Sequence, residues 1–222
     1  MLRKLLSEFL GTCILVSAVV GSGTMAANLS SDRGVELLIN TISTVLALAI
    51  LIQLFGSISG AHFNPAVSFS EWIQKLLPPT HFLGYVVAQF IGGIAGVILA
   101  NLMFKNPALY PSHHVRSGGN LLLAEVVATA GLVFIIQMLR GQNKTALAPV
   151  MIASWIGCAY FFTSSTSFAN PAVTLARSFT DTFSGIAINS VTPFIFAQLL
   201  GAVLGTFLGN YFNYSREKET HG

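Results

Sequence analysis

Charged residues are scarce in this sequence. Lys and Arg together number 11, and Asp and Glu number 8, in a chain of 222 residues. So few charges exclude a water-exposed surface over most of the chain. The net charge of +3 gives no sign of nucleic-acid binding. With 53% hydrophobic residues, the composition is that of a protein embedded in lipid.

Cysteines and catalytic motifs are also sparse. The two cysteines, Cys13 and Cys158, both fall in apolar segments, so no disulfide framework is implied. The sequence contains no set of nucleophile, base and acid residues, and no nucleotide-binding glycine loop. We therefore expect neither an enzyme nor a bound cofactor or metal.

Long apolar runs dominate the chain instead. Six runs are long enough to cross about 30 Å of hydrocarbon as helices, and they cover residues 5–27, 36–55, 82–103, 121–139, 146–163 and 188–212. The first run follows basic residues, so a cleavable signal sequence is an alternative interpretation. Against it, the run is too long for a signal sequence and carries Glu8. The sequence therefore predicts an all-α membrane protein with six transmembrane helices.

The distribution of basic residues predicts the orientation of the chain. If the N-terminus is cytoplasmic, seven basic residues lie on the cytoplasmic side, namely Arg3, Lys4, Lys75, Arg140, Lys144, Arg216 and Lys218. Three lie on the other side, namely Arg33, Lys105 and Arg116. Because cytoplasmic segments carry an excess of Lys and Arg, we expect both termini in the cytoplasm.

A tripeptide occurs twice in the sequence. Asn64-Pro65-Ala66 recurs as Asn170-Pro171-Ala172, and each copy is followed by Val. Glu8 in the first apolar run is matched by Glu125 in the fourth. Each half of the chain thus has three crossings and one Asn-Pro-Ala segment. Because three is odd, the halves enter the membrane from opposite sides, which makes an inverted repeat with its working site near the midplane.

The repeat extends well beyond these motifs. Residues 88–92 (AQFIG) are matched by 197–201 (AQLLG). We place the repeats at approximately 1–105 and 118–214, within a single membrane domain of residues 1–222. Glycines spaced by four residues occur in the same runs, and we expect them to let helices pack closely: Gly92, Gly96, Gly201, Gly205 and Gly209.

The Asn-Pro-Ala segments have the residue types of a helix start. Asn is a preferred N-cap, and Pro is favoured at the first helical position. Residues 57–69 are too apolar for a solvent loop and too short to cross, so we expect a segment that enters the membrane and returns. Two such half-helices, capped by Asn64 and Asn170, would meet with their positive ends facing and repel cations. Each asparagine NH₂ would then face a narrow polar path.

These segments resemble the two signature motifs of the aquaporin and glycerol-facilitator family, the major intrinsic proteins. Residues 59–67 (SGAHFNPAV) resemble the first motif and 167–172 (SFANPA) the second, and the resemblance covers almost the whole chain. It implies six tilted helices with two half-helices, a homotetramer with one pore per subunit, and a place in a bacterial inner membrane. It also implies that Glu8 and Glu125 accept hydrogen bonds from the backbone of the half-helix segments.

One position departs from the family pattern. Most members have an arginine directly after the second Asn-Pro-Ala, where it narrows the outer pore together with an aromatic residue, and here this residue is Val173. Matching the other filter positions by spacing gives Thr44, Cys158 and Ser167, of which none is aromatic or charged. This set predicts a filter that is wider and less polar than that of a water-selective channel.

The resemblance implies passive conduction of water or small neutral solutes. With this filter, we expect a channel for glycerol-like polyols and water. Neutral arsenite is included because some bacterial relatives with this kind of substitution are associated with arsenic detoxification. A water-selective channel is the alternative within the family, and a proton-coupled transporter is a less favoured one. The expected partners are these solutes, the lipid bilayer and further copies of the chain.

Arg177 has two interpretations. It lies one helical turn beyond Val173 and would either restore part of the missing positive charge or pair with Asp181 at a solvated rim. We favour the pairing with Asp181.

The histidines also have a functional and a structural interpretation. By resemblance, His62 lines the cytoplasmic half of the pore and offers a hydrogen bond to solute, and we favour this over a role in gating. His113 and His114, next to Arg116, could mark a metal or pH site, but we expect them to be solvated loop residues.

Overall fold

The computed structural model describes residues 1–220, and for residues 214–220 the backbone alone. The side chains of Arg216 and Lys218, used above for the orientation, lie outside the described part. The α-helices are α1 (Leu2–Leu29), α2 (Arg33–Ser59), α3 (Pro65–Ile73), α4 (Pro79–Met103), α5 (Gly119–Gly141), α6 (Ala148–Phe162), α7 (Pro171–Ala176) and α8 (Ile188–Thr220). Two 3₁₀ turns, η1 (Thr145–Leu147) and η2 (Arg177–Phe179), precede α6 and follow α7.

Six of the helices are long and apolar enough to cross a bilayer: α1, α2, α4, α5, α6 with η1, and α8. This confirms the predicted fold class. The helices start or end a few residues beyond several of the predicted apolar runs, because their ends are polar. The α2 helix, for example, begins at Arg33 because the Asp32 carboxylate caps it by accepting hydrogen bonds from the backbone of Gly34 and Val35 (2.8 and 3.0 Å).

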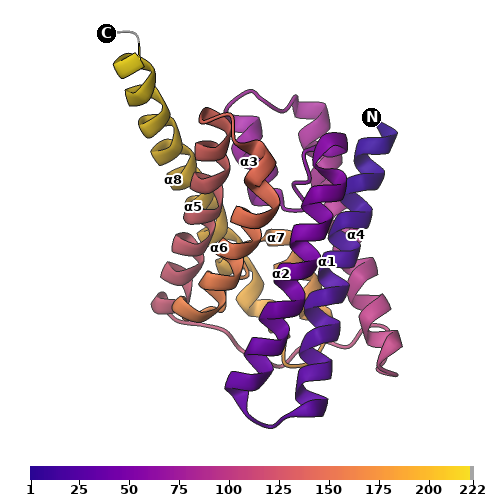
Figure 1. Ribbon diagram of the computed structural model, residues 1–222. Coiled ribbons are helices and arrows are strands. Elements are labelled where there is room, and N and C mark those ends of the chain that lie inside the picture. The colour runs from indigo at the N-terminus through magenta and orange to yellow at the C-terminus, as the bar shows by residue number, and fades with distance from the viewer. Residues whose placement is uncertain (221–222) are drawn as a thin grey trace.

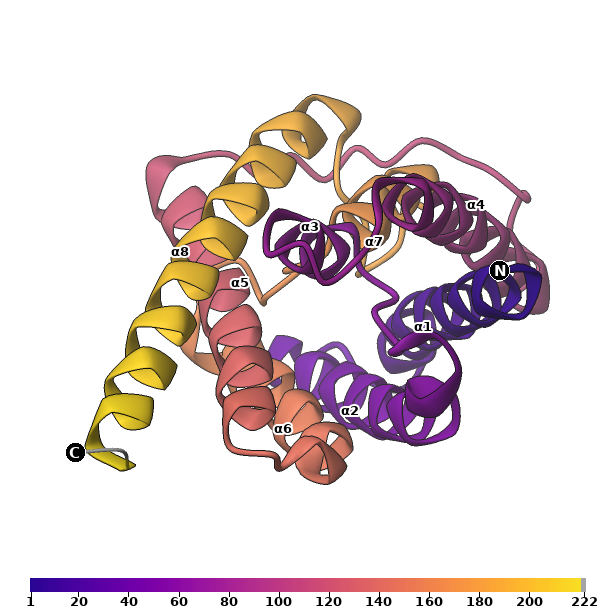
Figure 2. The ribbon, with the colours of Figure 1, turned by 90° about the horizontal axis from the view of Figure 1, so that it is seen from above.

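The spanning helices surround the two short helices α3 and α7 (Figure 2). In the first half α1 packs on α2 and α4, and in the second half α5 packs on α6 and α8. The short helices reach across: α7 packs against α4, and α3 against α8. The start of α1 and the end of α8 lie at the same end of the bundle (Figure 1).

Both short helices begin at an Asn-Pro-Ala segment. The α3 helix starts at Pro65, and the Asn64 side chain caps it by accepting a hydrogen bond from the backbone of Ala66 (2.9 Å). The α7 helix starts at Pro171, and Asn170 accepts hydrogen bonds from the backbone of Ala172 and Val173 (3.0 and 3.2 Å). The predicted helix starts and caps are confirmed.

Glycines bring the paired helices into backbone contact. A methyl group built on Gly96 would lie 2.3 Å from the backbone oxygen of Cys13 in α1, and one on Gly205 would lie 2.4 Å from that of Ala130 in α5. Gly92 and Gly201 are equally close to Phe9 and Val126 (2.4 and 2.6 Å). These contacts join α4 to α1 and α8 to α5 in the same way, so the glycines act in packing as predicted.

Gly96→Ala and Gly205→Ala should each destabilise the protein by about 1–3 kcal/mol, because the added methyl group must displace backbone. Unfolding of the purified protein in detergent measures this. Gly56→Ala is the matched control, since a methyl group there meets nothing within 4 Å. Equal stability of all three variants would contradict the packing role.

Candidate functional site

The two half-helices are joined at their starting residues. The side-chain amide of Asn64 donates a hydrogen bond to the carbonyl oxygen of Ala169 (2.7 Å), and that of Asn170 donates one to the carbonyl oxygen of Phe63 (2.8 Å). Each asparagine therefore caps its own helix with oxygen and binds the opposite segment with nitrogen. This differs from the expectation that the whole NH₂ group faces the pore, because one of its two N–H groups holds the other half.

Two buried glutamates hold the segments that precede the half-helices. The Glu8 carboxylate accepts hydrogen bonds from the backbone N–H groups of His62 and Phe63 (3.1 and 2.7 Å). The Glu125 carboxylate accepts them from Phe168 and Ala169 (2.9 and 2.8 Å). Both glutamates are 0% exposed. The contacts are those implied by the family resemblance, and they satisfy donors that have no water at this depth.

Each glutamate is braced by a glutamine that the sequence analysis did not assign to the site. The Gln89 amide donates to Glu8 (2.8 Å) and to the hydroxyl of Ser68 (2.9 Å). The Gln198 amide donates to Glu125 (2.6 Å) and to the hydroxyl of Thr174 (2.8 Å). The signal was present, since both glutamines belong to the matched segments 88–92 and 197–201. A buried amide in an apolar helix needs partners, and the repeat supplies the same ones twice.

The segments held in this way have a strained backbone. Ala61 and Phe63 have φ values of 51° and 48°, and Ser167 and Ala169 have values of 52° and 46°. Residues other than glycine rarely adopt this left-handed region, and each such residue costs about 1–3 kcal/mol. The conformation turns successive N–H groups towards one carboxylate, as in anion-binding backbone nests. The carboxylates therefore stabilise a chain path that the backbone alone would not take.

Glu8→Ala and Glu125→Ala should each cause low yield and poor folding. Every amide left without a partner inside the membrane costs about 1–3 kcal/mol. Membrane-inserted yield and thermal unfolding in detergent measure the effect.

Glu36→Ala is the control, because Glu36 is also a buried carboxylate (4% exposed), but among the described residues it binds the side chain of Arg33 (2.8 Å) and no backbone N–H. Normal yield of Glu8→Ala with a changed proton dependence of flux would contradict the structural role and favour a transporter.

A cavity of about 670 Å³ runs past the junction. Asn64 and Asn170 both line it, and so does His62. At the α3 and α5 end it is lined by Glu71 and Arg140, whose side chains form an ion pair (2.5 Å). Neither Glu8 nor Glu125 lines the cavity. The polar groups of the path are thus the two asparagines, His62 and a few residues at each end.

His62 is held in place by two contacts. Its Nδ1 atom lies 3.0 Å from the hydroxyl of Ser68, and its ring packs edge-on against Tyr85 with 5.2 Å between centroids. Its place in the cavity wall agrees with the position that the family resemblance implies.

Three of the four residues assigned to the filter line the other part of the cavity. They are Thr44, Ser167 and Val173, which are 3%, 3% and 5% exposed. Cys158 is not among the lining residues, and its side chain is exposed on the outside of α6.

The assignment of Cys158 was therefore wrong, because counting back from Asn170 gave the wrong helical phase. Two residues further along α6, on the opposite face of the helix, Tyr160 lines the cavity. Its hydroxyl donates to that of Thr44 (3.3 Å). The residues around the assigned filter positions therefore include an aromatic one. The sequence analysis had suggested that they include none.

Arg177 also differs from expectation. It does not pair with Asp181 at a solvated rim, because it is 3% exposed and lines the cavity. Its guanidinium lies 3.5 Å from the ring centroid of Phe168, and its Nε–H donates to the carbonyl oxygen of Ser184. The sequence could not reveal this placement, since Ser184 reaches Arg177 only through the fold of the following loop.

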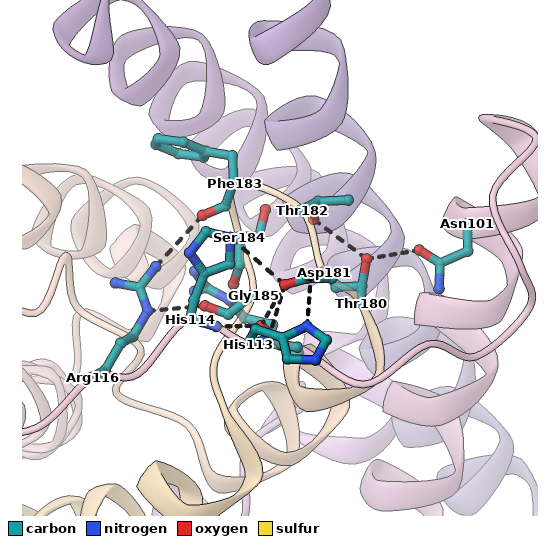
Figure 3. Close-up of polar contacts among 12 residues, drawn as sticks. Asn101, His113, His114, Arg116, Thr180, Asp181, Thr182, Phe183, Ser184 and Gly185 are labelled. Atoms are coloured by element: carbon teal, nitrogen blue, oxygen red, sulfur yellow. Dashed lines mark hydrogen bonds and ion pairs between the residues drawn. The ribbon is translucent and has the colours of Figure 1, made fainter.

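Asp181 instead joins the loop after η2 to the loop after α4 through His113 (Figure 3). The carboxylate accepts a hydrogen bond from the backbone N–H of His113 (2.9 Å) and contacts its ring nitrogen Nδ1 (2.9 Å). These contacts hold the pKa of the Asp181 carboxyl below its ordinary value. The His114 ring is 3.8 Å away from the same carboxylate. The two histidines are therefore not simply solvated, as the sequence analysis had expected.

Arg116 secures the same loop pair. Its Nε–H donates to the carbonyl oxygen of Gly185 (2.9 Å) and an Nη–H reaches that of Phe183 (3.5 Å) (Figure 3). Its guanidinium also lies 5.1 Å from the Phe168 ring centroid. The loops after α4 and after η2 are thus tied to Phe168, next to the assigned filter residue Ser167.

Six spans around two facing half-helices and a continuous cavity define a membrane channel, and comparison with known proteins identifies the family. Residues 1–167 match the family described as "Major intrinsic protein". The chain is 48% identical over 201 residues to "Aquaglyceroporin AqpS" of Rhizobium meliloti (strain 1021), covering 90% of this chain and 86% of that protein. It is 30% identical to "Aquaporin Z" of Brucella melitensis biotype 1, covering 94% and 96%.

A solved structure has the same fold. The X-ray structure of the aquaglyceroporin from Plasmodium falciparum matches with a TM-score of 0.72, covering 96% of this chain and 95% of that one, at 18% sequence identity. The chain belongs to the major intrinsic protein family. It is an integral membrane protein with six spans, from a family of channels and not of enzymes.

Proposed function

We propose that the protein is a passive channel for small neutral solutes, with a filter wide enough for glycerol-like polyols as well as water. The observation that carries the proposal is Val173, which lines the cavity where most family members have an arginine. The side chain of valine is short and uncharged, so it leaves room that an arginine would fill. The similarity to a protein named an aquaglyceroporin supports the same solute class.

The composition of the cavity wall suits such a solute. Thr44 and Tyr160 contribute hydroxyl groups, and Leu48 and Ile52 contribute apolar surface. A polyol presents hydroxyls on one side and C–H groups on the other, so it can exchange water for hydroxyl contacts without a charged partner. Neutral arsenous acid offers a similar array of hydroxyls, and we include it among the proposed solutes.

The junction should contribute to the exclusion of cations. The N-termini of α3 and α7 face each other across the two asparagines, and each helix start carries a partial positive charge. One N–H of each asparagine amide is not used in joining the halves and is available to a passing solute. A neutral solute can thus hydrogen-bond to the asparagine amides as it crosses the midplane, while the positive field there repels a proton or a sodium ion.

Two alternatives are less well supported. A water-selective channel, in line with the similarity to Aquaporin Z, would need a narrower filter than Val173 provides. A proton-coupled transporter would need ionisable groups along the path. Glu8 and Glu125 lie behind the cavity wall, bound to backbone, and Glu71 and Arg140 are paired with each other.

We further propose that both termini are cytoplasmic and that four copies assemble, each with its own pore. The excess of basic residues on one side supports the orientation, and the start of α1 and the end of α8 lie at one end of the bundle (Figure 1). Assembly as a homotetramer rests on the family resemblance. The proposed repeat boundaries, 1–105 and 118–214, fall in the loops after α4 and before α5, and within the last turns of α8.

Permeability measured on purified protein in liposomes tests the function. Wild-type protein should speed the flux of glycerol and arsenite above that of empty liposomes. Val173→Arg should reduce both fluxes several-fold more than water flux. The long charged side chain narrows the lumen, and narrowing lowers the permeability most for the larger solutes.

Val173→Met is the matched control, since it lengthens the side chain without adding a charge. Comparisons use equal amounts of inserted protein. If Val173→Arg conducts glycerol, arsenite and water in the wild-type ratio, Val173 does not set the selectivity.

A further inference from the structure

The filter region lacks the arginine that follows the second Asn-Pro-Ala in most of the family, yet a cation is present nearby. Arg177 lies one helical turn beyond Val173 and lines the same cavity. It is 3% exposed, so its charge is enclosed by protein and cavity and not dissolved in bulk water. A cation in such a site acts on the lumen far more strongly than a cation at a solvated rim.

The guanidinium of Arg177 is held in one orientation. Its central carbon lies over the Phe168 ring, 3.5 Å from the centroid, and its Nε–H donates to the carbonyl oxygen of Ser184. The backbone is fixed as well, since the carbonyl oxygen of Arg177 accepts a hydrogen bond from Ile186 (3.3 Å). Together these contacts hold one edge of the side chain against the wall.

The other edge of the guanidinium is free to meet solute. Among the described residues, the two Nη groups of Arg177 have no hydrogen-bond partner, and they are not among the sealed, unsatisfied atoms of the interior. They carry four of the five N–H donors of the side chain. Since Arg177 lines the cavity, these donors are available to acceptor oxygens of a molecule inside it.

The charges around Arg177 leave the region positive. Arg116 approaches the same Phe168 ring, with its guanidinium 5.1 Å from the centroid. Arg116, Tyr160 and Glu125 are the titratable groups that act on Arg177 through space. Of these, Arg116 and Glu125 are charged at neutral pH. The Glu125 carboxylate already accepts three hydrogen bonds, two from backbone and one from Gln198. The nearby Asp181 is bound to His113.

We propose that Arg177 is the cation of the selectivity filter in this protein, in place of an arginine at Val173. The inference rests on the proposed function and deepens it. Arg177 repels cations and donates hydrogen bonds to hydroxyl or oxyacid oxygens, whereas Val173 leaves the lumen wide one turn away. Charge exclusion and width, which a single arginine would couple, are thereby assigned to separate residues.

Sodium leak and glycerol flux through proteoliposomes test the assignment, using equal amounts of inserted protein. Arg177→Gln should raise the sodium leak about tenfold or more, because the change removes a unit positive charge from the cavity wall, where water screens it less than in bulk. Glycerol flux should change less than the sodium leak, because glutamine still donates hydrogen bonds at this position and Val173 keeps the lumen wide. The double variant Val173→Arg/Arg177→Gln should restore sodium exclusion and lose glycerol flux.

Arg177→Lys provides a second test if the glutamine variant inserts poorly. Its sodium leak should be low at neutral pH and should rise as the lysine loses its proton, at or below its ordinary pKa of about 10.4. Wild-type protein should show no such rise, because arginine stays charged. A purely structural role for Arg177 predicts the same leak at every pH.

The outcomes separate the two proposals. If wild-type protein passes no glycerol, the proposed function is wrong. If wild-type protein passes glycerol and either Arg177→Gln or deprotonated Arg177→Lys still excludes sodium, only the assignment of Arg177 is overturned.

Discussion

The channel depends on how the backbone N–H groups of the two segments before α3 and α7 are hydrogen-bonded inside the membrane. Neither segment can form helix where it turns, and no bulk water is at hand in the hydrocarbon to accept its N–H groups. Glu8 and Glu125 replace that water, and each binds two successive N–H groups and a buried glutamine amide. A carboxylate is an expensive group to bury, and it is tolerated because every contact around it is a donor. Without these two groups the strained turns, and with them the junction, would not persist.

The junction follows from the segments being held. Once Phe63 and Ala169 are fixed, their carbonyl oxygens accept the amides of Asn170 and Asn64. The same asparagines cap α3 and α7, so each half sets the position of the other. Most polar groups of the two segments are consumed in this bonding. At the junction the lumen is therefore left with few polar groups, which suits transient contact with a neutral solute better than tight binding.

The sequence predicted the parts that depend on local chemistry. The starts of the helices that Asn64 and Asn170 cap follow from capping preferences. The equivalence of Glu8 and Glu125 follows from the repeat. The assignment of Cys158 to the filter was wrong because spacing from the second Asn-Pro-Ala does not fix which face of the distant helix α6 points into the cavity. The predicted pairing of Arg177 with Asp181 was wrong because the position of Arg177 depends on Phe168 and on Ser184, which lies in a loop whose fold local sequence does not specify. Side chains whose position depends on tertiary contacts lay beyond such reasoning.

Amide hydrogen exchange in the membrane-inserted protein tests the central claim most directly. The N–H groups to follow are those bound by the two carboxylates, of His62, Phe63, Phe168 and Ala169. They belong to non-helical segments beside a cavity, so unbound they would exchange at the rate of an open loop. The account predicts exchange as slow as in the spanning helices. Exchange at loop rates in folded, conducting protein would show that the carboxylates do not hold these segments.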